Sequence, residues 1–495
     1  MTTTDSPQEP APQAISPQRS SLDDGKILWL IPEAWRLNLT SAPWVRRIIK
    51  SPFFNFAPTL LNLWIFVIII IGAFVAPQIG NANLGIMFVW ILWWVLLMMV
   101  MVPFLGRIWC QSCPLPSLGE WMQRKSIVGR TPDKEFLGLK KRWPKALSNM
   151  WLVNFIFLGL ALFSGILTTR PWATGLLFLS IIVVDLIVAY VFRLRAFCLY
   201  LCPVGGFLGL FSNFATVEVR SKDKDICARH VPKECVVGSS TGYGCPWMQL
   251  PFSQTRNTYC GMCFECLRSC SYDNMMVQLR PPGTDLLVDE HRGLDEAYKG
   301  LIMLSCAILY SVVMMGPWGF IKDGANVLTW KAWAVYAGAF LLWALLVFPG
   351  IFWLVSAISR VLSKKAGEAQ APLKRFFVAY SYTLVPLGMM AWIAFSFGIL
   401  LPNGSYVLSV ISDPWNQGWN LFGTAGFAWQ PFLTGLTPYL QILVMLGALL
   451  FSINIATKIA GQLFPSDSRR AVHSLIPVIL FHMTAVAALL ALFVG

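Results

Sequence analysis

The residues best suited to chemistry in this 495-residue sequence are its twelve cysteines. Eleven of them lie between positions 110 and 270, most in groups with only two or three residues between neighbours. Such short spacing favours metal ligation over disulfide formation, because neighbouring thiolates can then reach one shared centre. The sequence therefore predicts metal or iron–sulfur sites, and the spacing indicates which cysteines share one.

The densest group is Cys260-x2-Cys263-x2-Cys266-x3-Cys270. Bacterial ferredoxins have this spacing: three cysteines of a tight loop bind one cubane, and the fourth reaches a second cluster. The next residue is Ser271, where such runs usually have proline. A structural zinc site is the alternative, although four cysteines in one run are a rare zinc pattern.

A looser group lies upstream, at Cys227, Cys235 and Cys245-Pro246. In two-cluster ferredoxins the cysteine before proline completes the other cluster. We therefore predict a [4Fe–4S] cluster one whose ligands are Cys245, Cys260, Cys263 and Cys266.

Cluster two would take Cys227, Cys235 and Cys270, and it is one cysteine short. His230 stands where the second ligand belongs. Three outcomes are open: a His-ligated [4Fe–4S] cluster, a three-iron cluster, or a fourth ligand of another kind. The plain alternative for His230 is a solvated loop histidine. Imidazole in place of thiolate should raise the reduction potential.

Two further cysteine pairs form an internal repeat. Arg107-Ile-Trp-Cys110-x2-Cys113-Pro and Arg195-Ala-Phe-Cys198-x3-Cys202-Pro each follow a pair of apolar segments, and Cys110 and Cys198 are 88 residues apart. We predict that the four thiolates hold one further iron–sulfur centre, with the arginines favouring their charged form. A redox-active dithiol and plain reduced thiols are the alternatives.

The elements that position these cysteines are membrane helices. Hydrophobic residues make up 56% of the chain and charged residues only 13%, which excludes an ordinary soluble enzyme, a disordered protein and a disulfide-stapled secreted domain. The fold class predicted is a polytopic α-helical membrane protein with about nine transmembrane helices and a ferredoxin-like insert. The spans expected from length and hydropathy are 58–77, 83–105, 149–169, 172–192, 300–320, 332–358, 376–401, 436–456 and 474–494.

Lys and Arg concentrate in alternate loops, such as 106–148 and 359–375, whereas 78–82 and 402–435 hold none. This pattern predicts a prokaryotic cytoplasmic (inner) membrane protein with its N-terminus and clusters in the cytoplasm and its C-terminus outside. It also explains the formal charge of +14 without nucleic acid. The organisation expected is a disordered tail (1–24), an interfacial amphipathic segment (25–57), two helix-pair repeats (58–206), a cytoplasmic ferredoxin-like domain (207–299), two helices (300–358) and a further module with an outer aromatic loop (359–495).

A Cys-Pro repeat in a membrane scaffold, followed by a ferredoxin-like insert, resembles the membrane polyferredoxins of anaerobic respiration, the NapH/NosR type, which includes the CcoG-like proteins. The resemblance covers residues 57–320. It implies an integral-membrane electron carrier, supplied by quinol or a cytoplasmic donor, with [4Fe–4S] clusters at the cysteines above. This chain departs from the family in its x2 spacing after Cys110, in the missing upstream cysteine and in four additional spans over 330–495.

Several single residues indicate a functional role less strongly than the cysteines do. Asp185, inside a predicted span, is a candidate for taking a proton from quinone chemistry, or it pairs with a neighbouring helix. His482 has only His473 as a companion, so haem is not expected. We interpret Cys306 as a buried small residue and Glu120 as a helix-surface charge.

The function predicted is an iron–sulfur electron-transfer subunit without a terminal catalytic site of its own. It would work in a respiratory chain between quinone or quinol, or a cytoplasmic donor, and a partner redox protein such as a c-type or b-type cytochrome. Lipid, other redox subunits and quinone are the expected partners. A redox-sensing transporter and a metallocentre assembly factor are the alternatives.

Overall fold

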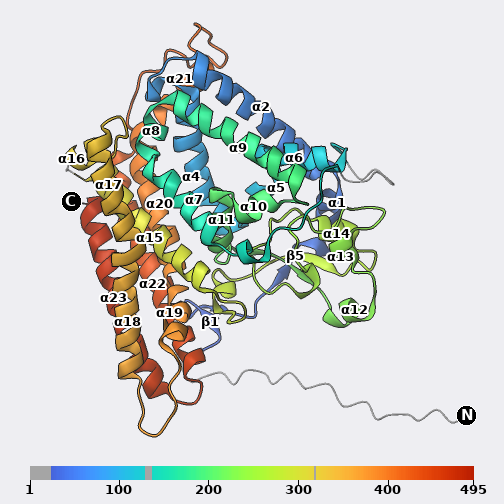
Figure 1. The fold of residues 1–495 in the computed structure, drawn as a ribbon, viewed down its shortest axis with the longest axis vertical. Coiled ribbons are helices and arrows are strands. Elements are labelled where there is room, and N and C mark those ends of the chain that lie inside the picture. Colours follow the sequence, from blue (N-terminus) through green and yellow to red (C-terminus); the bar gives the residue numbers. More distant parts are fainter. Residues whose placement is uncertain (1–23, 129–136, 317–318, 495) are drawn as a thin grey trace, which may run out of the picture.

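The computed structural model of the protein describes residues 24–128, 137–316 and 319–494. The predicted disordered tail, residues 1–24, lies outside the described residues except for Asp24. Helices dominate the fold, and the small amount of sheet is formed by the N-terminal segment and the cysteine-rich insert (Figure 1).

Eight helices of the described residues are long and apolar enough to cross a membrane. Their bounds agree with eight of the expected spans to within a few residues at most ends, because runs of about 20 apolar residues are a direct signal for such helices. They are α2 (Phe53–Val75), the continuous helix Leu84–Leu105 (α3, η3, α4 and η4), α9 (Pro171–Val191), α15 (Leu294–Met315), Trp330–Leu362 (α17, η8 and α18), Leu373–Asn403 (α19 and α20), Thr434–Leu463 (η9 and α22) and α23 (Ser468–Val494).

The ninth expected span, 149–169, is not one long helix. It consists of α7 (Trp151–Leu162) and α8 (Ser164–Thr169), which are separated at Phe163. The indole of Trp333 donates a 3.2 Å hydrogen bond to the Leu162 carbonyl beside the break. Hydropathy reports apolar composition rather than helical continuity, so the sequence did not reveal this interruption.

The two Cys-Pro repeats share one local design. In the first, α5 (Trp109–Ser112) and α6 (Pro114–Arg124) follow the helix that ends at Leu105. In the second, α10 (Ala196–Tyr200) and α11 (Pro203–Phe211) follow α9. Each proline starts the second short helix, where it fits because its missing N–H has no helical partner to lose. The helices α2 and α9 of the two repeats run side by side (Figure 1).

The insert, residues 207–299, contributes two strands to a three-stranded antiparallel sheet in the order β3-β5-β4. Strand β4 (Val217–Ser221) pairs with β5 (Met275–Leu279), and β3 (Leu37–Asn38) from the N-terminal segment adds to the other edge of β5. The amphipathic helix α1 (Pro43–Lys50) follows, and Lys50 Nζ contacts Asp273 Oδ1 at 2.9 Å. The N-terminal segment therefore packs on the insert.

The remaining described elements are short. They are β1 (Lys26–Ile27), β2 (Ile31–Pro32), η1 (Leu39–Ser41), η2 (Gly80–Ala82), η5 (Lys145–Leu147), α12 (Lys224–Arg229), α13 (Glu234–Val237), η6 (Pro251–Ser253), α14 (Glu265–Ser269), η7 (Thr284–Leu287), α16 (Gly319–Gly324) and α21 (Ser405–Ser412).

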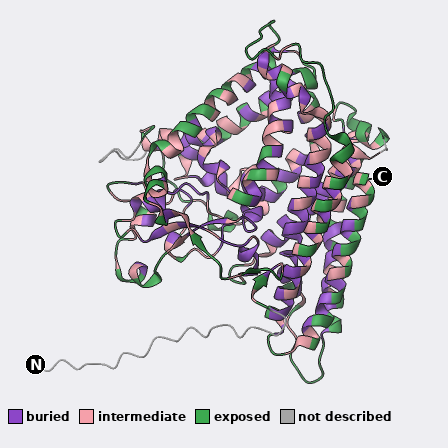
Figure 2. Cartoon of the chain, turned by 180° about the vertical axis from the view of Figure 1, so that it is seen from behind, coloured by how far each residue is buried: buried purple, intermediate pink, exposed green. Residues whose placement is uncertain are grey.

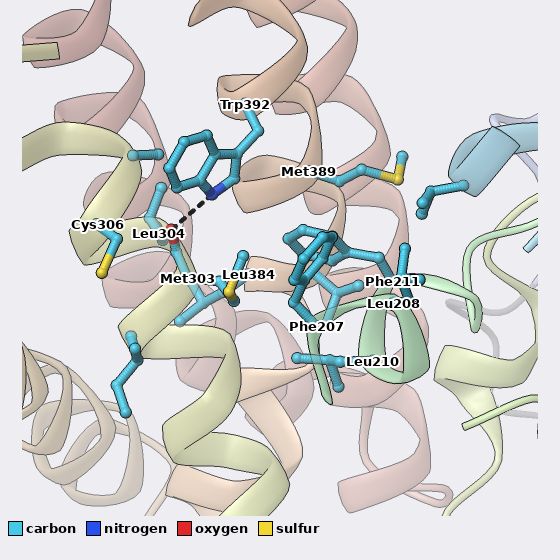
Figure 3. Close-up of a cluster of buried hydrophobic side chains, with 14 of the residues drawn as sticks. Phe207, Leu208, Leu210, Phe211, Met303, Leu304, Cys306, Leu384, Met389 and Trp392 are labelled. Atoms are coloured by element: carbon cyan, nitrogen blue, oxygen red, sulfur yellow. Dashed lines mark hydrogen bonds between the residues drawn. The ribbon is translucent and has the colours of Figure 1, made fainter. Parts of the chain in front are cut away.

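The largest core joins the second repeat to the C-terminal helices. Phe207 and Phe211 of α11 lie among apolar side chains of α15 and of α20 (Leu384–Asn403) (Figure 3). The indole of Trp392 donates a 3.0 Å hydrogen bond to the Met303 carbonyl across this contact. Buried residues face the interior of the helix assembly, and exposed apolar residues line its periphery (Figure 2). An apolar periphery is what a lipid-facing surface needs.

Candidate iron–sulfur centres

The two Cys-Pro motifs meet at one buried site. Their four thiols line a single cavity of about 90 Å³, and they are close enough to one another to interact electrostatically. Aromatic side chains such as Trp93, Trp109 and Phe157 form much of the remaining wall. The fold thus assembles, from segments far apart in the sequence, a four-cysteine set of the kind that holds a [4Fe–4S] cluster: Cys110, Cys113, Cys198 and Cys202.

The arginine before each pair lies at this site. Arg195 Nη1 donates a 2.6 Å hydrogen bond to the Cys110 carbonyl, so the second repeat contacts the first directly. Arg107 is 2% exposed and donates from Nη1 to the Thr258 carbonyl at 2.8 Å. Its Nε and Nη2 have no hydrogen-bond partner among the described residues. A buried cation with unpaired N–H groups beside four cysteines fits a negatively charged centre.

Glu120 is not the surface charge that the sequence suggested. Its carboxylate is buried, accepts a 2.7 Å hydrogen bond from Arg195 Nε, and also pairs with Arg124. Burial by itself raises the pKa of a carboxyl, but Arg124 and Arg195 outweigh it and hold the pKa of Glu120 below its usual value. The sequence missed this network because α6 and the second Cys-Pro motif meet only in the folded chain.

Asp185 lies in α9, as expected for a residue of the fourth predicted span, and is 3% exposed. Its carboxylate packs on Gly119 of α6: a Cβ at that glycine would lie 2.5 Å from Asp185 Oδ2. Oδ2 has no hydrogen-bond partner among the described residues. The structure therefore places Asp185 next to the network of Glu120 and Arg195, and its role in quinone or proton chemistry stays a prediction.

The four cysteines predicted for cluster one also come together. The loop before α14 carries Cys260 and Cys263, α14 carries Cys266, and Cys245 approaches from the preceding loop. Burial raises the pKa of Cys245 to about 12, with a smaller contribution from Cys260. Within the described ranges, no three His, Cys, Asp or Glu side chains converge on one point as the ligands of a single metal ion would. The ligands of a cubane lie farther apart, because each cysteine binds a different corner.

Trp247 connects this group to the site of the two Cys-Pro motifs, whose cysteines are called here the membrane cysteines (Cys110, Cys113, Cys198 and Cys202). Its indole is 1% exposed and packs on Gly261, where a Cβ would lie 1.8 Å from the ring. The guanidinium of Arg107 lies over the same ring at 4.4 Å, and that of Arg195 lies at 5.7 Å. The cluster-one loop, the indole and the two arginines thus form one continuous contact, which the sequence did not indicate.

The three cysteines predicted for cluster two lie beside one another. Cys235 interacts electrostatically with Cys227 and Cys270, and burial raises its pKa to about 11. Asn274 donates from Nδ2 to Cys227 Sγ at 3.2 Å and from its backbone N–H to Cys270 Sγ at 3.4 Å. Cys235 also interacts with Cys245 and Cys266 of cluster one, so the two groups are neighbours.

His230 follows α12, one turn after Cys227. Its Nδ1 donates a 2.8 Å hydrogen bond to the Ile226 carbonyl, and its ring stacks on Tyr272 at 4.4 Å. A donating Nδ1 leaves Nε2 as the nitrogen free to ligate a metal. Ligation of cluster two by His230 stays a prediction.

Two other residues lie outside the predicted cysteine groups. His482 is buried and bonds the Val478 carbonyl at 2.6 Å and Thr383 Oγ1 at 3.0 Å, which satisfies both ring nitrogens. Cys306 is fully buried in α15 (Figure 3).

A comparison with protein families matches residues 86–143 and 174–220 to a 4Fe-4S binding domain. The two matched segments begin 88 residues apart, at 86 and 174, and each contains one Cys-Pro motif. Together they cover less than half of the chain.

A curated relative is the "Methylamine utilization ferredoxin-type protein MauN" of Paracoccus denitrificans, which is 29% identical over 141 residues, 25% of this chain and 44% of the relative. The chain thus spans less than half of that relative's length. No solved structure matches. Both matches confirm the expected resemblance to ferredoxin-type 4Fe–4S electron-transfer proteins, and the eight apolar helices fit a membrane polyferredoxin.

Proposed function

We propose that this chain, which resembles ferredoxin-type 4Fe–4S proteins, is the electron-transfer subunit of a membrane redox complex. It passes electrons between quinone or quinol, or a cytoplasmic donor, and a partner redox protein such as a cytochrome. The observation that carries the proposal is the meeting of Cys110, Cys113, Cys198 and Cys202 at one buried cavity.

The arrangement of the insert supports the same function. Two groups of thiols lie next to each other, one around Cys266 and one around Cys235, and Trp247 joins the first to the arginines of the membrane site. A bound iron–sulfur cluster supplies reversible one-electron chemistry. The chain's own residues hold the clusters, keep them apart from water and set their electrostatic surroundings.

The loop charges support a location in the prokaryotic cytoplasmic membrane, with the insert and the N-terminus in the cytoplasm. Opposite sides for the two termini require an odd number of crossings. Eight long helices are present in the described residues, so this topology needs α7 and α8 to cross together as the ninth segment.

Anaerobic spectroscopy of the purified, intact protein tests the proposal. A quinol analogue should bleach the visible absorbance of the oxidised clusters, or a quinone analogue should restore it after chemical reduction. If neither occurs although the clusters are present, quinone is not a partner. If partner proteins from the same membrane also fail to exchange electrons with them, electron transfer is excluded and a sensor or assembly role replaces it.

A further inference from the structure

Lys299 is a buried lysine at the end of the predicted insert, 207–299, one residue before the span expected at 300–320. It lies in α15 and is fully buried. Its Nζ has no hydrogen-bond partner among the described residues. An ammonium buried without a counter-charge is costly, so such a group points to a negative partner.

The acidic residues nearest in sequence on α15 have other partners. Asp295 Oδ2 accepts a 2.7 Å hydrogen bond from the Met150 backbone N–H. Glu296 pairs with Arg256 at 2.8 Å and also bonds Tyr382. The electrostatic neighbours of Lys299 are instead the thiol of Cys306, whose interaction is the larger, and that of Cys202.

The surroundings of Lys299 place it against the membrane cysteine site. Its Nζ lies 4.5 Å above the ring of Phe157, which lines the four-cysteine cavity. It also lies 3.3 Å from the position of a Cβ at Gly206, whose N–H donates to the Cys202 carbonyl. Lys299 thus approaches the first turn of α11, just after Cys202.

We propose that Lys299 is a counter-charge for the iron–sulfur centre at the membrane cysteines, and that its positive charge raises the reduction potential of that centre. The inference rests on the proposed function, because it needs a cluster at Cys110, Cys113, Cys198 and Cys202. A cluster bound by four thiolates brings negative charge into an apolar wall, and reduction adds one more electron. A fixed cation nearby stabilises the reduced state, since net charge is a determinant of cluster potential.

Redox titration of the full-length protein, followed by EPR, tests this role. Lys299→Met should shift the potential of the membrane centre to a lower value, whereas Lys299→Arg should keep it close to that of the wild type. Lys458→Met is the matched control: Lys458 is also buried, in α22, but contacts Asp24 and Glu33 at 3.5 Å rather than a cysteine. The control should leave the potential unchanged.

Iron content separates the remaining outcomes. A fully loaded Lys299→Met protein with an unchanged potential overturns the inference and leaves the proposed function intact. If Lys299→Met loses the iron of the membrane centre, recovery in Lys299→Arg supports the charge requirement and failure to recover contradicts it. If Cys110→Ala combined with Cys198→Ala removes no iron from the wild type, the membrane centre itself is absent. The inference about Lys299 then fails together with the observation that carries the proposed function.

Discussion

The Nε atom of Arg195 donates a 2.7 Å hydrogen bond to Oε2 of Glu120, and both side chains are buried. The same guanidinium bonds the carbonyl of Cys110. A single arginine of the second repeat therefore contacts both the first cysteine of the other pair and the helix that follows it. This contact explains how two segments that are distant in sequence hold one set of four thiols.

Glu120→Ala should destabilise the protein strongly, because it leaves Arg195 and Arg124 without their buried counter-charge. Removal of one partner from a buried ion pair costs about 3–5 kcal/mol. Thermal unfolding in detergent measures the change. Glu368→Ala is the control, since Glu368 forms only exposed contacts with Lys365 and Arg470. Equal unfolding midpoints for the two variants would contradict the structural role of Glu120.

In the cluster-free protein, both the folding stability and the binding of clusters should depend on pH. Burial raises the pKa of Cys235 to about 11 and that of Cys245 to about 12, from a usual value of 9.0. Because the folded-state pKa is raised, the protonated thiols favour folding below about pH 9, and this contribution is lost as the pH rises toward 11 and 12.

Cluster binding requires thiolates, so binding of clusters to the cluster-free protein should release protons. The affinity should increase as the pH rises from about 7 to 9. Calorimetric titration of the cluster-free protein in buffers of different ionisation enthalpy measures the released protons. Binding that is independent of pH across this range would contradict protonated thiols at Cys235 and Cys245.

Gly261→Ala should remove cluster one, because its Cβ would lie 1.8 Å from the Trp247 ring and both are buried in contact. The loop between Cys260 and Cys263 would have to shift away from the indole. Iron content and EPR report the loss. Combining it with Trp247→Leu creates room, so the double variant should recover part of the iron. Full iron in Gly261→Ala alone would show that this close packing is not required.

His230→Ala should change the EPR spectrum of cluster two and leave that of cluster one as it is. The prediction follows from the place of His230 after Cys227 and from the Nδ1 bond to Ile226, which leaves Nε2 free. His291→Ala, in the loop before α15, is a control for loss of a histidine elsewhere in the insert. A spectrum of His230→Ala identical to that of the control would exclude ligation.

Hydropathy and spacing predicted the elements and the cysteine groups, because both signals are local in the sequence. The eight long helices lie where apolar runs of about 20 residues stand, and the thiols of each predicted cluster lie together. The break at Phe163 was missed, since Leu162 and Trp333 meet only across the fold.

The residues around the cysteines could not be predicted in the same way. Glu120 looked like a helix-surface charge, and nothing in the sequence distinguished Lys299 from other lysines. Their roles depend on burial and on contacts with Arg195 and Phe157, which come from other helices. Trp247 had no signal beyond its place shortly after Cys245.

We propose that the membrane cysteines hold an iron–sulfur centre in addition to the clusters predicted for the insert. Iron and acid-labile sulfide per chain, measured on protein purified without oxygen, test this proposal. The wild type should contain about four irons more than the roughly seven or eight that the insert can hold. Cys110→Ala combined with Cys198→Ala should remove that excess, and Cys306→Ala should remove none. Undiminished iron in the double variant would show that these cysteines hold no iron–sulfur centre.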